Sequence, residues 1–230
     1  MNLVGTGREW LGHLFDFELQ YSSKTFKFPN RDQSSPVQVR VRSLARASSG
    51  NTFMRASVNG TPFLQMGFNQ YATGEYAPYA TITDSTKNVS VNGDNILVEL
   101  EYDNSSNPAA IAWQDFIQVQ TRRNLNFAGA PLLFRDAQSI GPGEVVQFNI
   151  GNAATDLEVW DVTYHNEIQA MPLNFDNGTA SFTDTADQLK QYAAFAGSNM
   201  PQPNFIGALA QQNLRGLPTA EMLIVTHPIF

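Results

Sequence analysis

The sequence contains no cysteine. This excludes disulfide bonds, thiolate metal sites and a cysteine nucleophile from the chain itself. Charge is also scarce, because charged residues make up 15% of the 230 positions. The 14 basic residues are outnumbered by 21 acidic ones, which gives a formal net charge of −7. Such a chain repels a polyanion on average, so nucleic acid is not an expected partner.

Long apolar runs are missing as well. No stretch of the sequence reaches the roughly 18 apolar residues of a membrane-spanning helix, so we expect a chain that does not span a membrane. The first residues, Met1–Gly5, have neither the basic start nor the apolar segment of a signal peptide. We therefore expect any export signal to lie upstream of this fragment.

Aromatic and turn-forming residues are abundant. The chain has 16 Phe, 7 Tyr and 3 Trp, which favour strands, and 16 Gly and 12 Pro, which favour turns. Alternating apolar residues predict one strand over Phe15–Tyr21 and another around Val37–Val41. Asn59-Gly60 predicts a tight hairpin, and Asn177-Gly178 predicts another turn between strands.

About a dozen short segments fit strands in this way, more than the seven of a minimal immunoglobulin-type domain. We therefore predict a mainly β fold over residues 1–198, a two-sheet antiparallel β-sandwich of jelly-roll type. The composition changes near Met200. Residues 199–219 are expected to form a linker and a short helix that Asn204 caps and that extends to Gln212.

An apolar run, Met222–Val225, lies near the end of the sequence and is typical of a strand buried in a parallel sheet. A parallel strand needs a crossover and a partner strand further along the chain. We therefore interpret residues 220–230 as the first strand of a truncated α/β domain. The sandwich is then expected to be one module of a longer protein.

Residues that bear chemistry are few and scattered. The three histidines, His13, His165 and His227, lack metal-site spacing, and no serine elbow or paired carboxylate occurs. Asp161 is a candidate catalytic acid, but a structural carboxylate is the better interpretation. We expect no catalytic residue, no metal site and no cofactor in this chain.

Two groups of residues are candidate contacts for a ligand or partner. Tyr71, Tyr76 and Tyr79 lie in a turn-rich segment and are candidates for stacking against a sugar. Arg122 and Arg123 are candidates for an anion or partner contact. The alternative for both arginines is pairing with acidic residues at sheet edges, which contributes about 0–1 kcal/mol per exposed pair.

Seven segments in order carry a resemblance to a known family. They are Gly7–Gly12, Asp115–Ile117, Arg122–Leu125, Leu133–Arg135, Val159–Thr163, Gln211–Leu217 and Met222–Pro228. Their order and spacing resemble the region just upstream of the peptidase domain in gingipain-like peptidases of family C25, the sortases of the type IX secretion system. One departure is Arg215, where the family often has histidine.

The resemblance implies a protein on the cell surface of a Bacteroidetes-type bacterium, associated with the outer membrane. The full-length sortase cleaves C-terminal secretion signals from cargo and attaches the cargo to surface lipopolysaccharide. Its catalytic His and Cys belong to the downstream domain and have no counterpart here. Implied partners are that peptidase domain, the C-terminal domains of cargo and an anchoring protein of the outer membrane.

Three functions follow as hypotheses. The first is a non-catalytic β-sandwich module that supports the peptidase domain or its contacts with cargo and partners. The second is a carbohydrate-binding sandwich that recognises surface polysaccharide through the Tyr71–Tyr79 segment. The third, a self-sufficient hydrolase, has the least support because no nucleophile–base pair is visible in the sequence.

Overall fold

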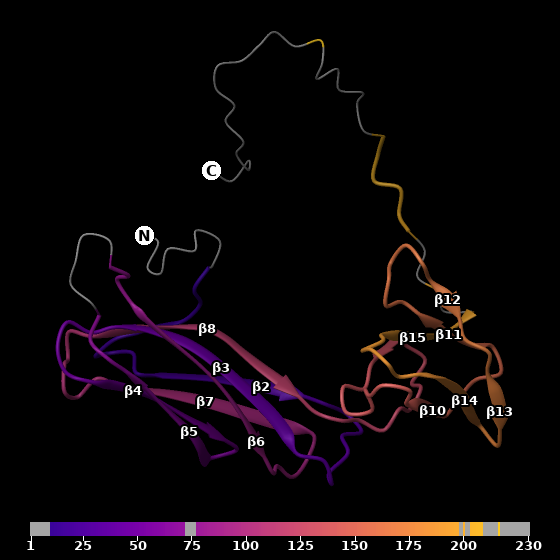
Figure 1. Ribbon diagram of the computed structural model, residues 1–230, viewed down its shortest axis with the longest axis horizontal. Coiled ribbons are helices and arrows are strands. Elements are labelled where there is room, and N and C mark those ends of the chain that lie inside the picture. The colour runs from indigo at the N-terminus through magenta and orange to yellow at the C-terminus, as the bar shows by residue number, and fades with distance from the viewer. Residues whose placement is uncertain (1–9, 72–76, 198–199, 201–202, 209–215, 217–230) are drawn as a thin grey trace. The chain divides into compact units, whose positions relative to one another are not determined.

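The computed structural model describes residues 10–71, 77–197, 200, 203–208 and 216. Contacts along the chain divide it into two compact units, Met1–Asn199 and Met200–Phe230. Within the described residues, the first unit consists of short β-strands joined by turns, and the ladders between these strands are all antiparallel (Figure 1). The prediction of a mainly β, antiparallel fold is confirmed.

Eight strands form the first group. They are β1 (Leu14–Phe15), β2 (Tyr21–Lys27), β3 (Val37–Arg46), β4 (Thr52–Val58), β5 (Thr61–Phe68), β6 (Thr81–Val89), β7 (Asn95–Asp103) and β8 (Ile111–Gln120). Their pairs are nested, because β1 pairs with β8, β2 with β7, β3 with β6 and β4 with β5. Two four-stranded sheets result, β1-β8-β3-β6 and β2-β7-β4-β5. This nesting is the connectivity of a jelly roll.

The core of the first group lies between these two sheets. β3 shows why, since Val37, Val39 and Val41 are fully buried while the residues between them are partly exposed. The same alternation on β7 buries Ile96, Val98, Leu100 and Tyr102. Alternate residues of a strand point to opposite faces, so each sheet turns one apolar face inward.

The strand predicted over Phe15–Tyr21 is interrupted. The Asp16 carboxylate accepts hydrogen bonds from the backbone N–H groups of Glu18 and Leu19, at 2.9 and 2.8 Å. This side-chain turn ends β1 after Phe15 and carries the chain across to the second sheet, where β2 begins at Tyr21. A run that alternates like one strand is therefore two strands in different sheets.

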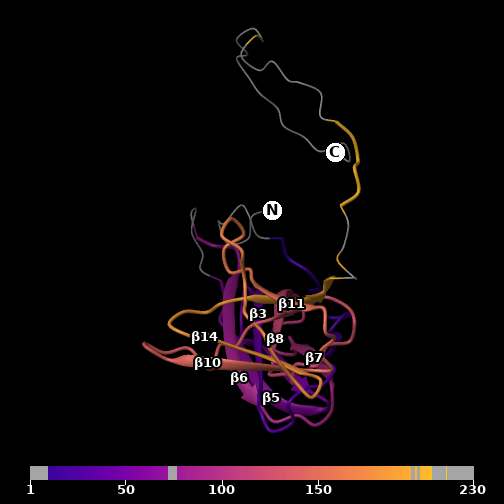
Figure 2. The same cartoon turned by 90° about the vertical axis from the view of Figure 1, so that its right-hand side faces the viewer.

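Seven strands form the second group. They are β9 (Leu132–Phe134), β10 (Val145–Gly151), β11 (Leu157–Asp161), β12 (Gln169–Ala170), β13 (Asn174–Asp176), β14 (Thr179–Thr185) and β15 (Tyr192–Ala196). They make a three-stranded sheet, β10-β14-β13, and a four-stranded sheet, β12-β11-β15-β9. Figure 2 shows β10, β11 and β14 of this group from a second direction.

Four aromatic rings form the centre of the second core. Phe134, Phe148, Phe182 and Tyr192 are all at least nine-tenths buried, and their ring centroids lie 5.1–6.3 Å apart. These separations suit the tilted and offset arrangements that aromatic pairs favour. The first and second cores share no residue. The expectation of a single two-sheet sandwich is therefore met only in part, because the described strands form two pairs of sheets.

The helix predicted from Asn204 to Gln212 is wrong over its first half. Residues 203–208 have no regular secondary structure, and Gly207 has a φ of 156°, far from helical values. Phe205 and Ile206 are 87% and 100% exposed, so no apolar face is buried. A helix this short depends on such burial. The rest of this helix and the strand expected over residues 220–230 lie outside the described residues.

Candidate functional site

Two of the three candidate tyrosines lie around one arginine. Tyr71 follows β5, Tyr79 precedes β6, and the guanidinium carbon of Arg46 at the end of β3 lies 5.6 Å from the centroid of the first ring and 5.4 Å from that of the second. Both distances fit cation–π contacts. Tyr79 is half exposed. Tyr76 lies outside the described residues.

The two candidate arginines make structural contacts. Arg122 forms an ion pair with Asp136, and the Nε of Arg123 donates a hydrogen bond of 2.8 Å to the carbonyl oxygen of Pro29. The arginines lie just after β8, and the backbone of Arg123 forms an isolated antiparallel β-bridge with that of Arg31. Both contacts support the segment that leaves the jelly roll.

A cavity of about 330 Å³ lies in the jelly roll. This volume falls at the lower end of the range of ligand pockets. Its lining comes from β2, from β8 and from the segment before β1. The lining residues are His13, Ser22, Ser23, Lys24, Phe26, Gln114 and Ile117. We call this cavity the β2–β8 cleft.

The β2–β8 cleft is polar at positions where a sandwich is normally apolar. Phe26 and Ile117 pack against the buried core, so their faces of β2 and β8 point inward. Ser22 and Lys24 share the face of Phe26 because they precede it by four and two residues. The Ser22 hydroxyl and the Gln114 side-chain oxygen lie 3.4 Å apart, which ties the two walls together.

Hydrogen-bond donors predominate in the cleft. His13 packs edge-on against Phe15, with ring centroids 4.7 Å apart, and its Nε2 is buried without a partner in the described residues. Lys24 adds a positive charge, and no Asp or Glu lines the cavity. The site could not be predicted from neighbouring residues, because Ser22 and Gln114, which face each other across it, are 92 positions apart in the sequence. The detectable signal is the pair of polar residues, Ser22 and Lys24, at inward positions of β2.

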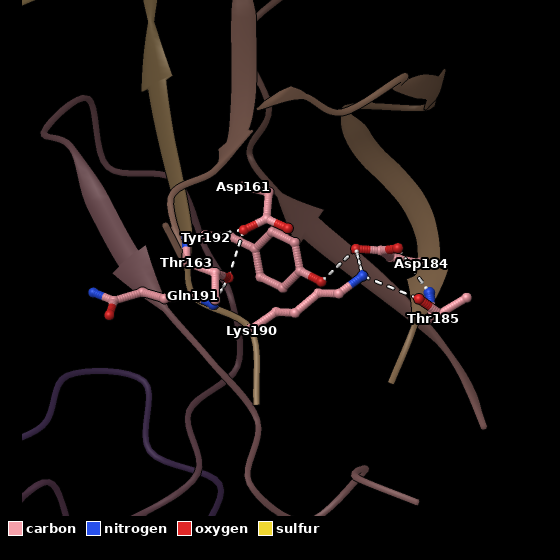
Figure 3. Close-up of polar contacts among 7 residues, drawn as sticks. All are labelled: Asp161, Thr163, Asp184, Thr185, Lys190, Gln191 and Tyr192. Carbon is pink, nitrogen blue, oxygen red and sulfur yellow. Dashed lines mark hydrogen bonds and ion pairs between the residues drawn. The ribbon is translucent and has the colours of Figure 1, made fainter. Parts of the chain in front are cut away.

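A second polar cluster joins β11, β14 and β15 (Figure 3). Tyr192 donates a hydrogen bond of 2.8 Å to Asp184 Oδ2, and Lys190 Nζ lies 2.8 Å from the same oxygen. On the other side of the tyrosine, Asp161 Oδ1 accepts hydrogen bonds from the backbone N–H and the hydroxyl of Thr163 at 2.9 and 2.5 Å. Asp161 thus has the structural role expected of it.

The charges of this cluster compensate one another. Burial acts to raise the pKa of Asp184, but hydrogen bonds from Lys190, Tyr192 and the N–H of Thr185 outweigh it, so the pKa lies below its ordinary value. Burial raises the pKa of Tyr192, and the hydrogen bond and charge of Asp184 raise it further. The neutral phenol of Tyr192 and the ammonium of Lys190 both contact the carboxylate of Asp184 at the end of the core. We therefore interpret this cluster as structural.

In the described part of the chain, no group of three or more His, Asp or Glu side chains has a geometry that would hold a metal ion. Nor does any helix among these residues have the length and apolarity that crossing a membrane requires. The nearest approach to a ligand site is therefore the β2–β8 cleft, with the Tyr71–Arg46–Tyr79 cluster as the second.

The fold is that of a β-sandwich module whose first eight strands form a jelly roll. Among solved structures it is similar to part of dimeric latent PorU from Porphyromonas gingivalis, with a TM-score of 0.75 and 20% sequence identity. The match covers 92% of this chain and 21% of PorU, so the chain spans about a fifth of that protein's length. At this identity the likeness establishes the fold.

Two further matches are weaker. The insecticidal δ-endotoxin Cry8Ea1 from Bacillus thuringiensis matches with a TM-score of 0.32 and 16% identity over 48% of this chain and 19% of the toxin. A cycloisomaltooligosaccharide glucanotransferase from Paenibacillus sp. matches with a TM-score of 0.29 and 9% identity. That match covers 76% of this chain and 40% of the glucanotransferase. No family-level description matches the sequence, and no curated protein matches it by sequence.

Proposed function

We propose that this chain is a non-catalytic module of a type IX secretion sortase of the C25 family. Its role is to support the peptidase domain that follows and to contribute surfaces for cargo or for a partner at the outer membrane. In this proposal the whole protein acts at the cell surface, where it cleaves C-terminal secretion signals and attaches cargo to lipopolysaccharide.

The structural likeness to PorU carries the proposal, and the sequence resemblance supports it. The likeness to PorU extends over 92% of the chain, and the chain independently shows seven sequence segments in the order of the same family. The chemistry of the chain supports a non-catalytic role, because it has no cysteine to act as a nucleophile. The two sandwiches then serve as a rigid β scaffold beside the reactive domain.

Two measurements test the proposal. One is the sequence of the gene beyond the codon for Phe230, and the other is the peptidase activity of the longer protein that the gene encodes. We expect the reading frame to continue into a domain with a catalytic cysteine and histidine. The longer protein should cleave a cargo that ends in a secretion signal, and the present chain alone should leave it intact. A stop codon directly after Phe230, or cleavage by the chain alone, contradicts the proposal.

Carbohydrate binding is the second candidate. The observation that favours it is the arrangement of Tyr71 and Tyr79 on either side of Arg46, with the Tyr79 ring half exposed. An exposed ring beside a guanidinium suits a sugar that offers both an apolar face and hydroxyl acceptors. Binding on a glycan array that is lost in Tyr79→Ala, but kept in Tyr164→Ala at an unrelated exposed tyrosine, would favour this function over the first.

A further inference from the structure

The first strand of the jelly roll is much shorter than its neighbours. The ladder between β1 and β8 has two residue pairs, whereas β2 and β7 share seven and β3 and β6 share nine. Just before β1, the N–H of Gly12 donates a hydrogen bond of 2.8 Å to the carbonyl oxygen of Gln114. The N–H of Gln114 in turn donates one of 2.9 Å to the carbonyl oxygen of His13. From residue 115 to residue 120, this side of β8 has no strand partner within residues 10–71 and 77–197. Alternate N–H and C=O groups there have no strand partner among the described residues and can pair with an added strand.

The opposite wall of the β2–β8 cleft is a second strand edge. β2 is the outermost strand of its sheet and pairs with β7 on its other side. The cleft thus lies where a longer first strand would cover the space between the two sheets. Its volume of about 330 Å³ is open to a ligand at this place.

The side chains in the cleft favour an acidic ligand. The ammonium of Lys24 has no ion-pair partner among the described residues, and no carboxylate lines the cavity. The Ser22 hydroxyl is engaged with the oxygen of the Gln114 amide, which leaves the amide nitrogen as a donor. The buried Nε2 of His13 adds an atom that has no partner in the described structure.

We propose that the β2–β8 cleft binds an extended peptide segment that adds to the edge of β8 and directs an acidic side chain toward Lys24. The six residues of β8 from 115 to 120 match the common length of a β-strand, about five to six residues. Strand addition supplies main-chain hydrogen bonds, and the cleft supplies the pocket for an inward side chain. A sugar would leave the free edge of β8 unpaired. This inference does not depend on the proposed function, since it rests on the two strand edges and their charges.

The test uses the full chain and a fluorescent hexapeptide, acetyl-Thr-Val-Asp-Val-Thr-Val-amide, with binding followed by fluorescence anisotropy. We expect saturable binding that weakens about tenfold or more when the peptide carries Asn in place of Asp, and by a similar factor in Lys24→Gln, because a charge-assisted hydrogen bond is lost in both. In NMR spectra of the isotope-labelled protein, the backbone amide signals of residues 115–120 should shift when the peptide binds.

Matched controls make the result specific. Lys27 lies three residues further along β2 and faces the other side, so Lys27→Gln should bind like the unsubstituted chain. A peptide N-methylated at alternate residues should not bind, because it cannot pair with a strand edge. Lys24→Gln and Lys27→Gln should both retain the unfolding temperature of the unsubstituted chain, since both lysines are exposed.

Four outcomes would overturn the proposal. They are absence of peptide binding, equal binding by Lys24→Gln, equal binding of the N-methylated peptide, and binding of tri-galacturonate in place of the peptide. The last outcome would assign the cleft to an acidic sugar. None of the four depends on whether the gene encodes a peptidase domain.

Discussion

The phenol of Tyr192 donates a hydrogen bond of 2.8 Å to Asp184 Oδ2 from a side chain that is 1% exposed. Tyr192 begins β15 in one sheet, and Asp184 lies near the end of β14 in the other sheet. The bond therefore joins the two sheets of the second sandwich at one end of its aromatic core. A hydrogen bond to a charged acceptor in such a place is among the stronger ones in proteins.

Removal of the Tyr192 hydroxyl should destabilise the second sandwich. We expect Tyr192→Phe to lower the free energy of unfolding by about 1.5–3 kcal/mol, because a partly buried carboxylate loses a donor while the packing of the ring is kept. The measurement is denaturant unfolding followed by signals of residues 125–197. The control is Tyr164→Phe, whose exposed hydroxyl lies 3.3 Å from Gln188 and whose loss should change stability by less than about 0.5 kcal/mol. Equal effects of the two substitutions would contradict this account.

Acid should remove the contribution of Asp184 to stability. The pKa of Asp184 is lowered in the folded protein, so its carboxylate stabilises the fold above the ordinary pKa of 3.8 and this stabilisation is lost as the pH falls through the folded value. We therefore expect Asp184→Asn to be less stable than the unsubstituted chain at pH 7. The difference between the two should shrink steadily below pH 3.8. A difference that stays constant from pH 7 to pH 2 would show that the charge of Asp184 has no such role.

A buried arginine in the jelly roll donates hydrogen bonds to four backbone carbonyl oxygens. Arg31 is 3% exposed and donates to the carbonyl oxygens of Val91, Gly93, Asp32 and Ser35. The contact with Gly93 is 3.0 Å long. The arginine thereby joins the β2–β3 connection to the turn between β6 and β7. Nothing in the sequence around Arg31 distinguishes it from the other arginines.

Loss of Arg31 should therefore cost more than loss of an exposed arginine. We expect Arg31→Met to lower the free energy of unfolding by about 3 kcal/mol or more, since each buried acceptor left without a donor costs about 1–3 kcal/mol. The matched control is Arg55→Met, which removes a half-exposed ion pair with Asp103 and should cost about 0–1 kcal/mol. Thermal unfolding of both variants measures the difference. Similar losses of stability in Arg31→Met and Arg55→Met would show that the buried hydrogen bonds of Arg31 do not stabilise the jelly roll more than an exposed ion pair does.

The sequence predicted those parts of the fold that depend on neighbouring residues. The buried valines of β3 follow from strict alternation, and the turns at Asn59-Gly60 and Asn177-Gly178 follow from the need for positive φ angles. The φ angles are 48° and 78° at Asn59 and Gly60, and 45° and 77° at Asn177 and Gly178. Such local rules hold because the side chain and the turn determine the backbone within a few residues.

The remainder depends on contacts between residues that are distant in the sequence. The break after Phe15 was missed because apolar residues continue to alternate through the turn that the Asp16 carboxylate forms. The β2–β8 cleft was missed because Ser22 and Gln114, which face each other across it, are 92 positions apart. The division into two cores was also missed, because the break near residue 125 has no linker-like composition.

The Asn59-Gly60 hairpin offers a test of backbone conformation alone. Gly60 has a φ of 78°, and a Cβ atom added there would have no atom within 4 Å. We expect Gly60→Ala to lower the free energy of unfolding by about 1–2 kcal/mol. This loss would come from the strained backbone and not from a steric clash. The control is Gly67→Ala on β5, where the backbone is not left-handed and the new methyl would lie 3.7 Å from the Phe53 ring, an ordinary contact. This second substitution should leave the unfolding free energy unchanged or raise it by up to about 1 kcal/mol, because alanine loses less entropy on folding than glycine. Thermal unfolding should separate the two variants by several degrees, and equal unfolding temperatures would show that the positive φ angle at Gly60 is not what the glycine provides.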